Sequence, residues 1–270
     1  MSSDDAVVYV IPDIARLRAQ YGGGRTTAVI GTGHSAITTI NELRLLAKEE
    51  TETSSSKAAV NLLWATRRAT DLYEDIDDDP LPQRVQLNAL GNALCGDDGA
   101  TVNEGFSVRH LGGVQLVEMK RNSGGKIELT FESSSSCSTD ETQLTTVAVD
   151  NVVANVGFRP DLEMTRELQV HRCYATEGPM KLAAALMAAS GSGGGDCLTQ
   201  ASAGKESLLC PEKNFLILGM KSYGRSSNFL LRVGNEQIAH AMELLGGGKP
   251  YTVTEEEEEE EEEGGGGGGK

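Results

Sequence analysis

The sequence predicts an α/β fold class, in which a mainly parallel sheet is covered by helices. Three observations carry this prediction. A β-branched run at Thr26–Ile30 is followed by a glycine turn, Gly31–Gly33, and then by apolar residues at helical spacing from His34 onward. A second strand-like run, Ala58–Trp64, comes after that helix. The order strand, glycine turn, helix, strand is that of a βαβ unit.

The remaining elements are predicted in chain order from the same signals. The apolar stripe of the first helix consists of Ala36, Ile37, Ile40, Leu43 and Ala47. After it we expect a short helix at Leu87–Leu94 and strands at Phe106–His110, Val114–Lys120, Lys126–Glu132 and, interrupted near Asp150, Thr146–Val156. The turn at 122–125 is expected to close a hairpin. Later elements are a helix at Met180–Ala189, a buried strand at Phe215–Leu218 and a helix at Gln237–Leu245.

Charge and composition exclude several classes of protein. The 270 residues carry a formal net charge of −16, and half of it lies in Glu255–Lys270, which holds nine Glu, six Gly and one Lys. This tail lacks apolar residues, so we expect it to be disordered. The rest of the chain is also acidic, whereas a basic face is typical of proteins that bind a phosphate backbone. We therefore expect no nucleic-acid partner.

Apolar runs and cysteines bear on location and on metal binding. No apolar run approaches the roughly 18 residues of a membrane-spanning helix, and Met1–Asp5 resembles neither a secretory nor a transit signal. We expect a cytoplasmic protein with no membrane partner. The five cysteines are widely spaced: Cys95, Cys137, Cys173, Cys197 and Cys210. Without a C-x-x-C pair, they argue against a local redox dithiol and a zinc ribbon, and no metal site is predicted.

The strongest local signal is Gly31-Thr32-Gly33-His34-Ser35-Ala36, a G-x-G-x-x-A between the first strand and the first helix. In a dinucleotide site the first glycine allows the tight turn, and the second lets the backbone approach a pyrophosphate. The small third residue lets the helix pack on the strand, and the N–H groups of the helix N-terminus face the phosphates. We interpret these six residues as a nucleotide-binding turn; the alternative is a glycine turn without a ligand.

The end of the second strand selects the nucleotide. A site for NAD usually has an acidic residue there, which accepts from the ribose hydroxyls. This chain has Arg67 and Arg68 instead, and the nearest acid, Asp71, lies beyond both. Guanidinium groups suit the 2′-phosphate of NADP(H), which the sequence therefore favours over NAD(H). The alternative is that the arginines pair with the acidic loop at 74–79.

Five segments resemble, in this order, those of the FAD-dependent pyridine nucleotide oxidoreductases. They are Val29–Ala36 (V-I-G-T-G-H-S-A), Leu63–Arg68 (L-W-A-T-R-R), Leu81–Arg84 (L-P-Q-R), Asn155–Asp161 (N-V-G-F-R-P-D) and Phe215–Arg225 (F-L-I-L-G-M-K-S-Y-G-R). The resemblance is to the thioredoxin-reductase-like flavoproteins, which have two dinucleotide-binding domains. It covers about residues 8–246, and the G-M-K-S-Y-G-R run is its most specific part.

The resemblance implies a Rossmann-like three-layer NAD(P)-binding domain with inserted antiparallel strands, followed by part of an FAD domain. The residues from Gly31 to Ala36 would hold the pyrophosphate, Arg67 and Arg68 would bind the 2′-phosphate, and Gly157 would lie beside the cofactor. Gly219 stands where many relatives have Gly-Asp, with the Asp on the flavin's ribityl chain; here Met220 and Lys221 follow.

Domain boundaries follow from these assignments. We predict a linker-like segment over 1–24, the NAD(P)-binding domain over 25–156, the FAD-domain-like segment over 157–249 and a disordered tail over 250–270. The relatives begin with a further G-x-G-x-x-G unit for FAD, of which this sequence has no counterpart before Arg25. We therefore expect either a fragment or a chain that has lost flavin binding.

Two functional hypotheses remain. The first is an NADPH-dependent FAD-type oxidoreductase, in which hydride passes from nicotinamide to flavin and on to an unknown small-molecule or protein acceptor. The second is a non-catalytic NADP(H)-binding fragment or subunit that lacks its own FAD site. No catalytic residue is identified. Weaker candidates are Lys221, Tyr223 and Arg225 for an anionic ligand, with a purely structural loop as the alternative.

Overall fold

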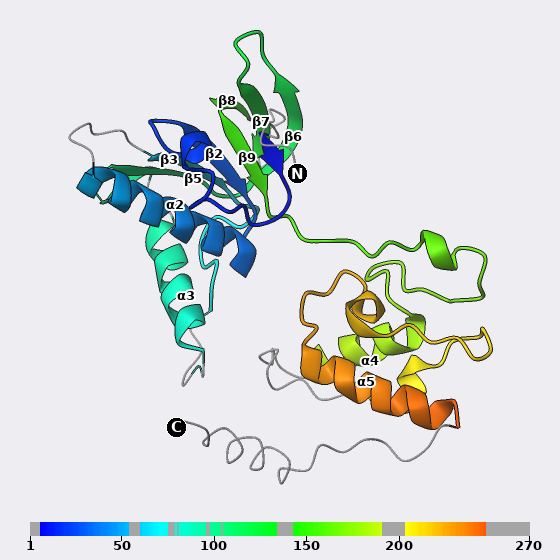
Figure 1. The fold of residues 1–270 in the computed structure, drawn as a ribbon. Coiled ribbons are helices and arrows are strands. Elements are labelled where there is room, and N and C mark those ends of the chain that lie inside the picture. Colours follow the sequence, from blue (N-terminus) through cyan, green and yellow to red (C-terminus); the bar gives the residue numbers. More distant parts are fainter. Residues whose placement is uncertain are drawn as a thin grey trace, which may run out of the picture. The chain divides into compact units, whose positions relative to one another are not determined.

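The chain divides into two compact units, residues 1–157 and 158–270 (Figure 1). The computed structural model describes residues 6–53, 60–74, 79, 81–95, 98–103, 105–133, 143–190 and 203–246. The predicted acidic tail and the Gly/Ser-rich stretch at 191–202 lie outside these ranges. The units are described separately below.

A six-stranded sheet forms the centre of the first unit. Its order is β1 (Val7–Val8), β9 (Asn151–Ala154), β2 (Thr26–Ile30), β3 (Val60–Ala65), β5 (Phe106–Leu111) and β4 (Asp98–Asn103). The first five strands are parallel, and β4 pairs with β5 in the antiparallel sense. Val29 of β2 lies opposite both Trp64 and Val153. Strands buried on both faces are near-continuous apolar runs, as β2, β3 and β9 are.

Helices cover one face of this sheet. α2 (His34–Thr53) buries the predicted stripe from Ala36 to Ala47 against the sheet, which confirms the helical spacing. α3 (Pro82–Leu94) packs beside it. It begins five residues before the predicted Leu87, because proline suits the first helical turn. Asp79 also accepts the N–H of Leu81 at 2.9 Å and pairs with Arg84 at 2.6 Å.

A three-stranded antiparallel sheet covers the other face. It consists of β6 (Val114–Arg121), β7 (Ile127–Ser133) and β8 (Leu144–Val149), in the order β6-β7-β8. Ile127, Leu129 and Phe131 of β7 pack against Ala28 and Leu63 of the large sheet. The first unit therefore has three layers, with the helices, the parallel sheet and the small sheet stacked in that order (Figure 1). The α/β fold class and the predicted hairpin at 122–125 are confirmed.

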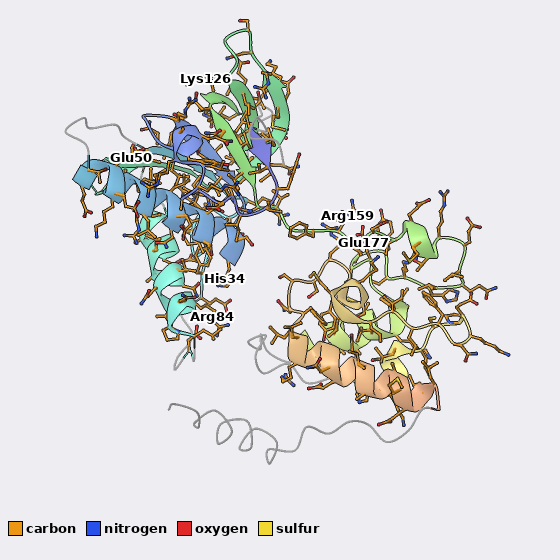
Figure 2. All side chains as sticks on the ribbon, viewed as in Figure 1. His34, Glu50, Arg84, Lys126, Arg159 and Glu177 are labelled. Atoms are coloured by element: carbon orange, nitrogen blue, oxygen red, sulfur yellow. The ribbon has the colours of Figure 1, made fainter. Side chains whose placement is uncertain are left out.

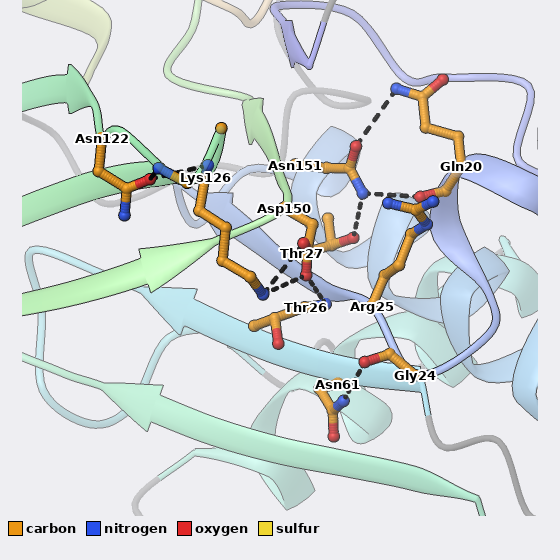
Figure 3. Close-up of polar contacts among 12 residues, drawn as sticks. Gln20, Gly24, Arg25, Thr26, Thr27, Asn61, Asn122, Lys126, Asp150 and Asn151 are labelled. Atoms are coloured by element: carbon orange, nitrogen blue, oxygen red, sulfur yellow. Dashed lines mark hydrogen bonds and ion pairs between the residues drawn. The ribbon is translucent and has the colours of Figure 1, made fainter.

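The predicted strand over 146–156 belongs to two sheets. β8 pairs with β7, whereas β9 pairs with β2. The change occurs at Asp150, whose carboxylate accepts the N–H of Thr26 at 2.9 Å and contacts Lys126 Nζ at 3.0 Å (Figure 3). The interruption expected near Asp150 is thus the crossing from one layer to the next. The strand predicted at Phe106–His110 is present as β5 and pairs in parallel with β3.

The beginning of the chain differs from the expected linker. Val7 and Val8 form the edge strand β1, and α1 (Arg18–Tyr21) follows. Ile14 and Tyr21 are buried in the core under the helices. Asn151 donates to Gln20 O at 2.8 Å, which ties the segment to β9 (Figure 3). The described part of this segment is packed into the first unit.

The second unit is mostly helix and loop. α4 (Met180–Ser190), α5 (Leu231–Leu244) and the short 3₁₀ turns η3 (Lys205–Leu208) and η4 (Gly219–Tyr223) surround a small apolar core. A further 3₁₀ turn, η1 (Glu163–Thr165), precedes them in the chain. The strand predicted at Phe215–Leu218 is wrong: these residues form a half-buried loop. Leu216 and Leu218 pack on the helix-lined core, where the described residues supply no neighbouring strand for pairing. None of the helices in the described ranges is long and apolar enough to cross a membrane.

Candidate functional site

The glycine turn lies at the point where the strand order of the sheet reverses. From β2 the chain proceeds through α2 to β3 and then β5 on one side, whereas β9 flanks β2 on the other. Open parallel sheets bind ligands at such switch points, beyond the carboxyl ends of the strands. Gly31 follows β2 directly, and Asn155 follows β9. The turn therefore stands where this fold class places a ligand.

Gly31 requires the absence of a side chain. Its φ is +128°, a conformation that L side chains rarely adopt. A Cβ there would lie 2.2 Å from the carbonyl oxygen of Asn155. The N–H of Gly31 donates to Ala65 O at 3.1 Å, and its own carbonyl accepts from Trp64 Nε1 at 2.9 Å. The turn is thus hydrogen-bonded to β3 on one side and lies directly against Asn155, after β9, on the other.

The start of α2 presents N–H groups that have no hydrogen-bond partner among the described residues. Ala36 N and Ile37 N donate to Gly33 O at 2.9 and 3.3 Å, so the helical bonds begin there. The N–H groups of Gly33, His34 and Ser35 precede these bonds, as at every helix N-terminus. All three residues are exposed, and a Cβ on Gly33 would have no atom within 4 Å among the described residues. Ala36 is buried on the sheet. The turn offers donors and open space on its outer side.

His34 connects the turn to α3. Its Nε2 lies 3.2 Å from Asn88 Oδ1, and its ring lies 6.1 Å from that of Tyr73 (Figure 2). The ring of Tyr73 packs on Gly91, where a Cβ would come within 2.2 Å. The Tyr73 hydroxyl is buried without a hydrogen-bond partner among the described residues. Burial raises the pKa of this hydroxyl, which stays protonated.

The two arginines follow β3 at the same edge of the sheet. Because Ile30 pairs with Ala65, Gly31 and Thr66 continue side by side from parallel strands. Arg68 Nη2 donates to Leu72 O at 2.5 Å. Arg67 is exposed and makes no hydrogen bond or ion pair within the described residues. The alternative pairing with the acidic loop falls largely on residues 75–78, outside the described ranges.

A series of buried side-chain contacts that the sequence analysis did not identify supports this edge of the parallel sheet. Thr66 Oγ1 lies 2.8 Å from His110 Nε2 and donates to Arg68 O at 2.6 Å. His110 also packs against Trp64, with ring centroids 4.9 Å apart. These contacts lead from the Gly31 carbonyl through the side chains of Trp64, His110 and Thr66 to the backbone of Arg68. Their only signal in the sequence is a lone histidine, His110, at the end of an expected strand.

The remaining predicted residues lie apart from this turn in the sequence. Gly157, at φ +85°, is exposed at the end of the first unit. Gly219 belongs to the second unit, where its N–H donates to Gln237 Oε1 at 2.8 Å and its carbonyl accepts from Ser222 at 2.7 Å. Tyr223, a weak candidate for an anionic ligand, is buried edge-on against Phe229, as the structural alternative expected. The described residues contain no His, Cys, Asp and Glu cluster that could hold a metal ion.

Comparisons with known proteins give structural likenesses only. No protein-family model matches the chain, and no curated protein sequence matches it. Bacillithiol disulfide reductase Bdr (YpdA) from Bacillus cereus is 16% identical over 90% of this chain and 54% of its own, with a TM-score of 0.49. The protein of the same name from Staphylococcus aureus is 16% identical over 91% and 58%, with a TM-score of 0.47. Thioredoxin reductase from T. acidophilum is 13% identical over 64% and 42%, with a TM-score of 0.39. The chain spans about half the length of these structures.

Proposed function

We propose that the first unit binds NADP(H) at the edge formed by β2, β3 and β9. The pyrophosphate would lie against the turn from Gly31 to Ala36 and accept from the N–H groups at the start of α2. Arg67 and Arg68 would bind the 2′-phosphate. The observation that carries the proposal is the glycine turn at the switch point. There, Gly31 must lack a side chain to pass Asn155, and Gly33 faces open space.

We also propose that this nucleotide serves an NADPH-dependent oxidoreductase of the FAD type. A bound nicotinamide would supply hydride-donating chemistry, and a flavin would supply the means to carry the electrons on to an acceptor. The chain's own part is to position the nucleotide through the turn and the arginines, while Trp64 and His110 hold those two segments together. The described residues do not identify the acceptor.

The fit of the two cofactors to the described residues differs. The turn at Gly31 has the free donors and space that a pyrophosphate needs. Gly219 was expected beside a flavin, but its N–H is already bonded to buried Gln237. No step is assigned to Gly219 for that reason. This contact favours the second candidate, in which the chain is an NADP(H)-binding subunit and the flavin site lies on a partner.

Titration of the full chain with NADPH and with NADH tests the nucleotide site. We expect tighter binding of NADPH, and we expect Arg67→Glu combined with Arg68→Glu to abolish that preference. Arg109→Glu, on the exposed side of β5, is the matched control. Unchanged affinities for both nucleotides in the double variant would refute the assignment of the arginines.

Absorbance spectroscopy separates the two candidates. A yellow protein whose flavin absorbance is bleached by NADPH supports the complete oxidoreductase. A colourless protein that binds NADPH, ignores added FAD and oxidises no NADPH with common acceptors supports the binding subunit.

A further inference from the structure

The second unit contains a cavity lined by three arginines, which the proposed nucleotide site does not use. Its lining includes Arg159, Arg172, Arg225, Glu177 and Cys173, and its volume is about 370 Å³. An adjoining depression shares Arg159, Arg172 and Glu177 but is not basic, because Arg166, Asp161 and Glu163 also line it. Three guanidinium groups against one carboxylate give the lining of the cavity an excess of positive charge, although the whole chain carries −16.

Two interlocked turns build the wall of the cavity. Cys173 N donates to Gly178 O at 2.9 Å, and Glu177 N donates to Cys173 O at 2.8 Å, which closes the first turn. Gly224 lies so close to this turn that a Cβ would stand 2.1 Å from Thr176 O. Arg225 N donates to the same oxygen at 2.7 Å. The segment that carries Arg225 is therefore fixed on the segment that carries Cys173 and Glu177.

The three arginines differ in how their donors are used. Arg159 Nε lies 3.0 and 3.2 Å from the two carboxylate oxygens of Glu177 (Figure 2). Arg172 Nη2 donates to Thr165 O at 3.2 Å, whereas its buried Nε has no hydrogen-bond partner among the described residues. The Arg225 side chain makes no hydrogen bond within them; its one interaction is attraction to Glu177. Within the described residues no hydrogen bond is made by Arg172 Nη1 or by the guanidinium of Arg225, so these groups remain as donors for a ligand.

We propose that this cavity binds the oxyanionic group, carboxylate or phosphate, of a small molecule. Arg172 and Arg225 would donate to its oxygens, and Glu177 would hold Arg159 beside them. Guanidinium groups form strong, often bidentate bonds with either anion. The proposal is independent of the proposed nucleotide site, which lies in the other unit.

Calorimetry and a thiol reaction test the proposal on the full chain. Inorganic phosphate and malonate are titrated separately at constant ionic strength, and alkylation of each cysteine by iodoacetamide is followed by peptide mass spectrometry. We expect at least one anion to bind and to slow alkylation of Cys173, which lines the cavity. Alkylation of Cys210, which lies in the same unit but does not line the cavity, is the internal control and should not change. Whichever anion binds more tightly, phosphate or the dicarboxylate malonate, shows whether the cavity favours a phosphate or a carboxylate group.

Substitutions locate the anion. Arg225→Gln, at an exposed side chain, should weaken binding roughly tenfold or more and remove the protection of Cys173. Arg172→Gln should do the same if its thermal melt shows that it folds. Arg232→Gln on α5, which pairs with Glu236, should bind as the unaltered chain does. Binding of neither anion, or binding to Arg225→Gln with unchanged affinity, would overturn the proposal. Loss of phosphate binding in the Arg67→Glu, Arg68→Glu variant would also overturn it, because the anion would then occupy the nucleotide site.

Discussion

Replacement of Gly31 by alanine is the sharpest test of how the nucleotide turn is built. The new Cβ would lie 2.2 Å from Asn155 O, whereas ordinary contacts begin at 3.4 Å. The backbones after β2 and β9 must therefore separate by more than 1 Å, and alanine must also adopt a φ of +128°. Strain of this kind costs about 1–3 kcal/mol by itself. With the lost packing, we expect the free energy of unfolding to fall by about 3 kcal/mol.

Thermal unfolding and NADPH titration measure the two consequences. A loss of about 3 kcal/mol corresponds to a decrease in Tm of roughly 6–12 °C for a domain of this size. NADPH affinity should fall as well, because the displaced turn no longer presents its N–H groups. A Gly31→Ala variant with the Tm of the unaltered chain would refute the close approach to Asn155.

Gly33→Ala is the matched control. Its Cβ would meet no described atom within 4 Å, and its backbone is not in the left-handed region. We expect the stability of this variant to change by less than about 1 kcal/mol. The methyl group would, however, occupy the space proposed for the pyrophosphate, so NADPH should bind at least about tenfold more weakly. Unaltered NADPH affinity in Gly33→Ala would show that the pyrophosphate lies elsewhere.

Three further predictions concern the first unit. Burial raises the pKa of Asp150, but hydrogen bonds from Thr26 N–H and Lys126 outweigh it, so the net pKa is lowered. The folded state therefore gains stability from this carboxylate above its unfolded pKa and loses it as the pH falls through the folded value. Chemical unfolding of the unaltered chain and of Asp150→Asn is compared between about pH 5 and pH 2. The difference between their free energies of unfolding should shrink as the pH falls; a difference that stays constant would contradict the lowered pKa of Asp150. Trp64→Phe removes the donor to Gly31 O and should lower the free energy of unfolding, measured with denaturant, by about 1–3 kcal/mol. NADPH binding should also weaken; a loss of stability with unaltered NADPH affinity would show that Trp64 does not support the nucleotide site. Tyr73→Phe removes a buried hydroxyl without a partner and should leave stability equal or raise it by up to about 1 kcal/mol; a clear loss in the same assay would reveal a partner.

Local patterns predicted the βαβ unit well because its signals are short-range. The stripe from Ala36 to Ala47 repeats at helical spacing, so burial of one face requires a helix at that place. The hairpin turn is equally local: the Asn122 side chain accepts from Gly124 N and Lys126 N, both at 3.0 Å. Such elements are defined by residues within a few positions of one another.

Pairing between distant segments was predicted less well. The run at Phe215–Leu218 has strand-like composition, yet a strand needs a neighbour, and the helix-lined core around Leu208 gives it apolar contacts instead. β4 was not predicted, and the sheet to which the strand at Phe106–His110 belongs was not predicted either, since strand composition does not specify a partner. Burial and available edges decide these pairings after the chain has collapsed.

The sequence alone determined that a tight turn with two glycines joins a strand to a helix at Gly31–Gly33, and that two arginines follow the next strand. Only the tertiary structure decided that Asn155, far along the chain, closes on Gly31, and that Trp64 and His110 join the turn to the arginines. It alone brought Arg159, Arg172 and Arg225 to one cavity. The physical reason is that backbone conformation follows from neighbouring residues, whereas a binding surface depends on which distant segments pack together.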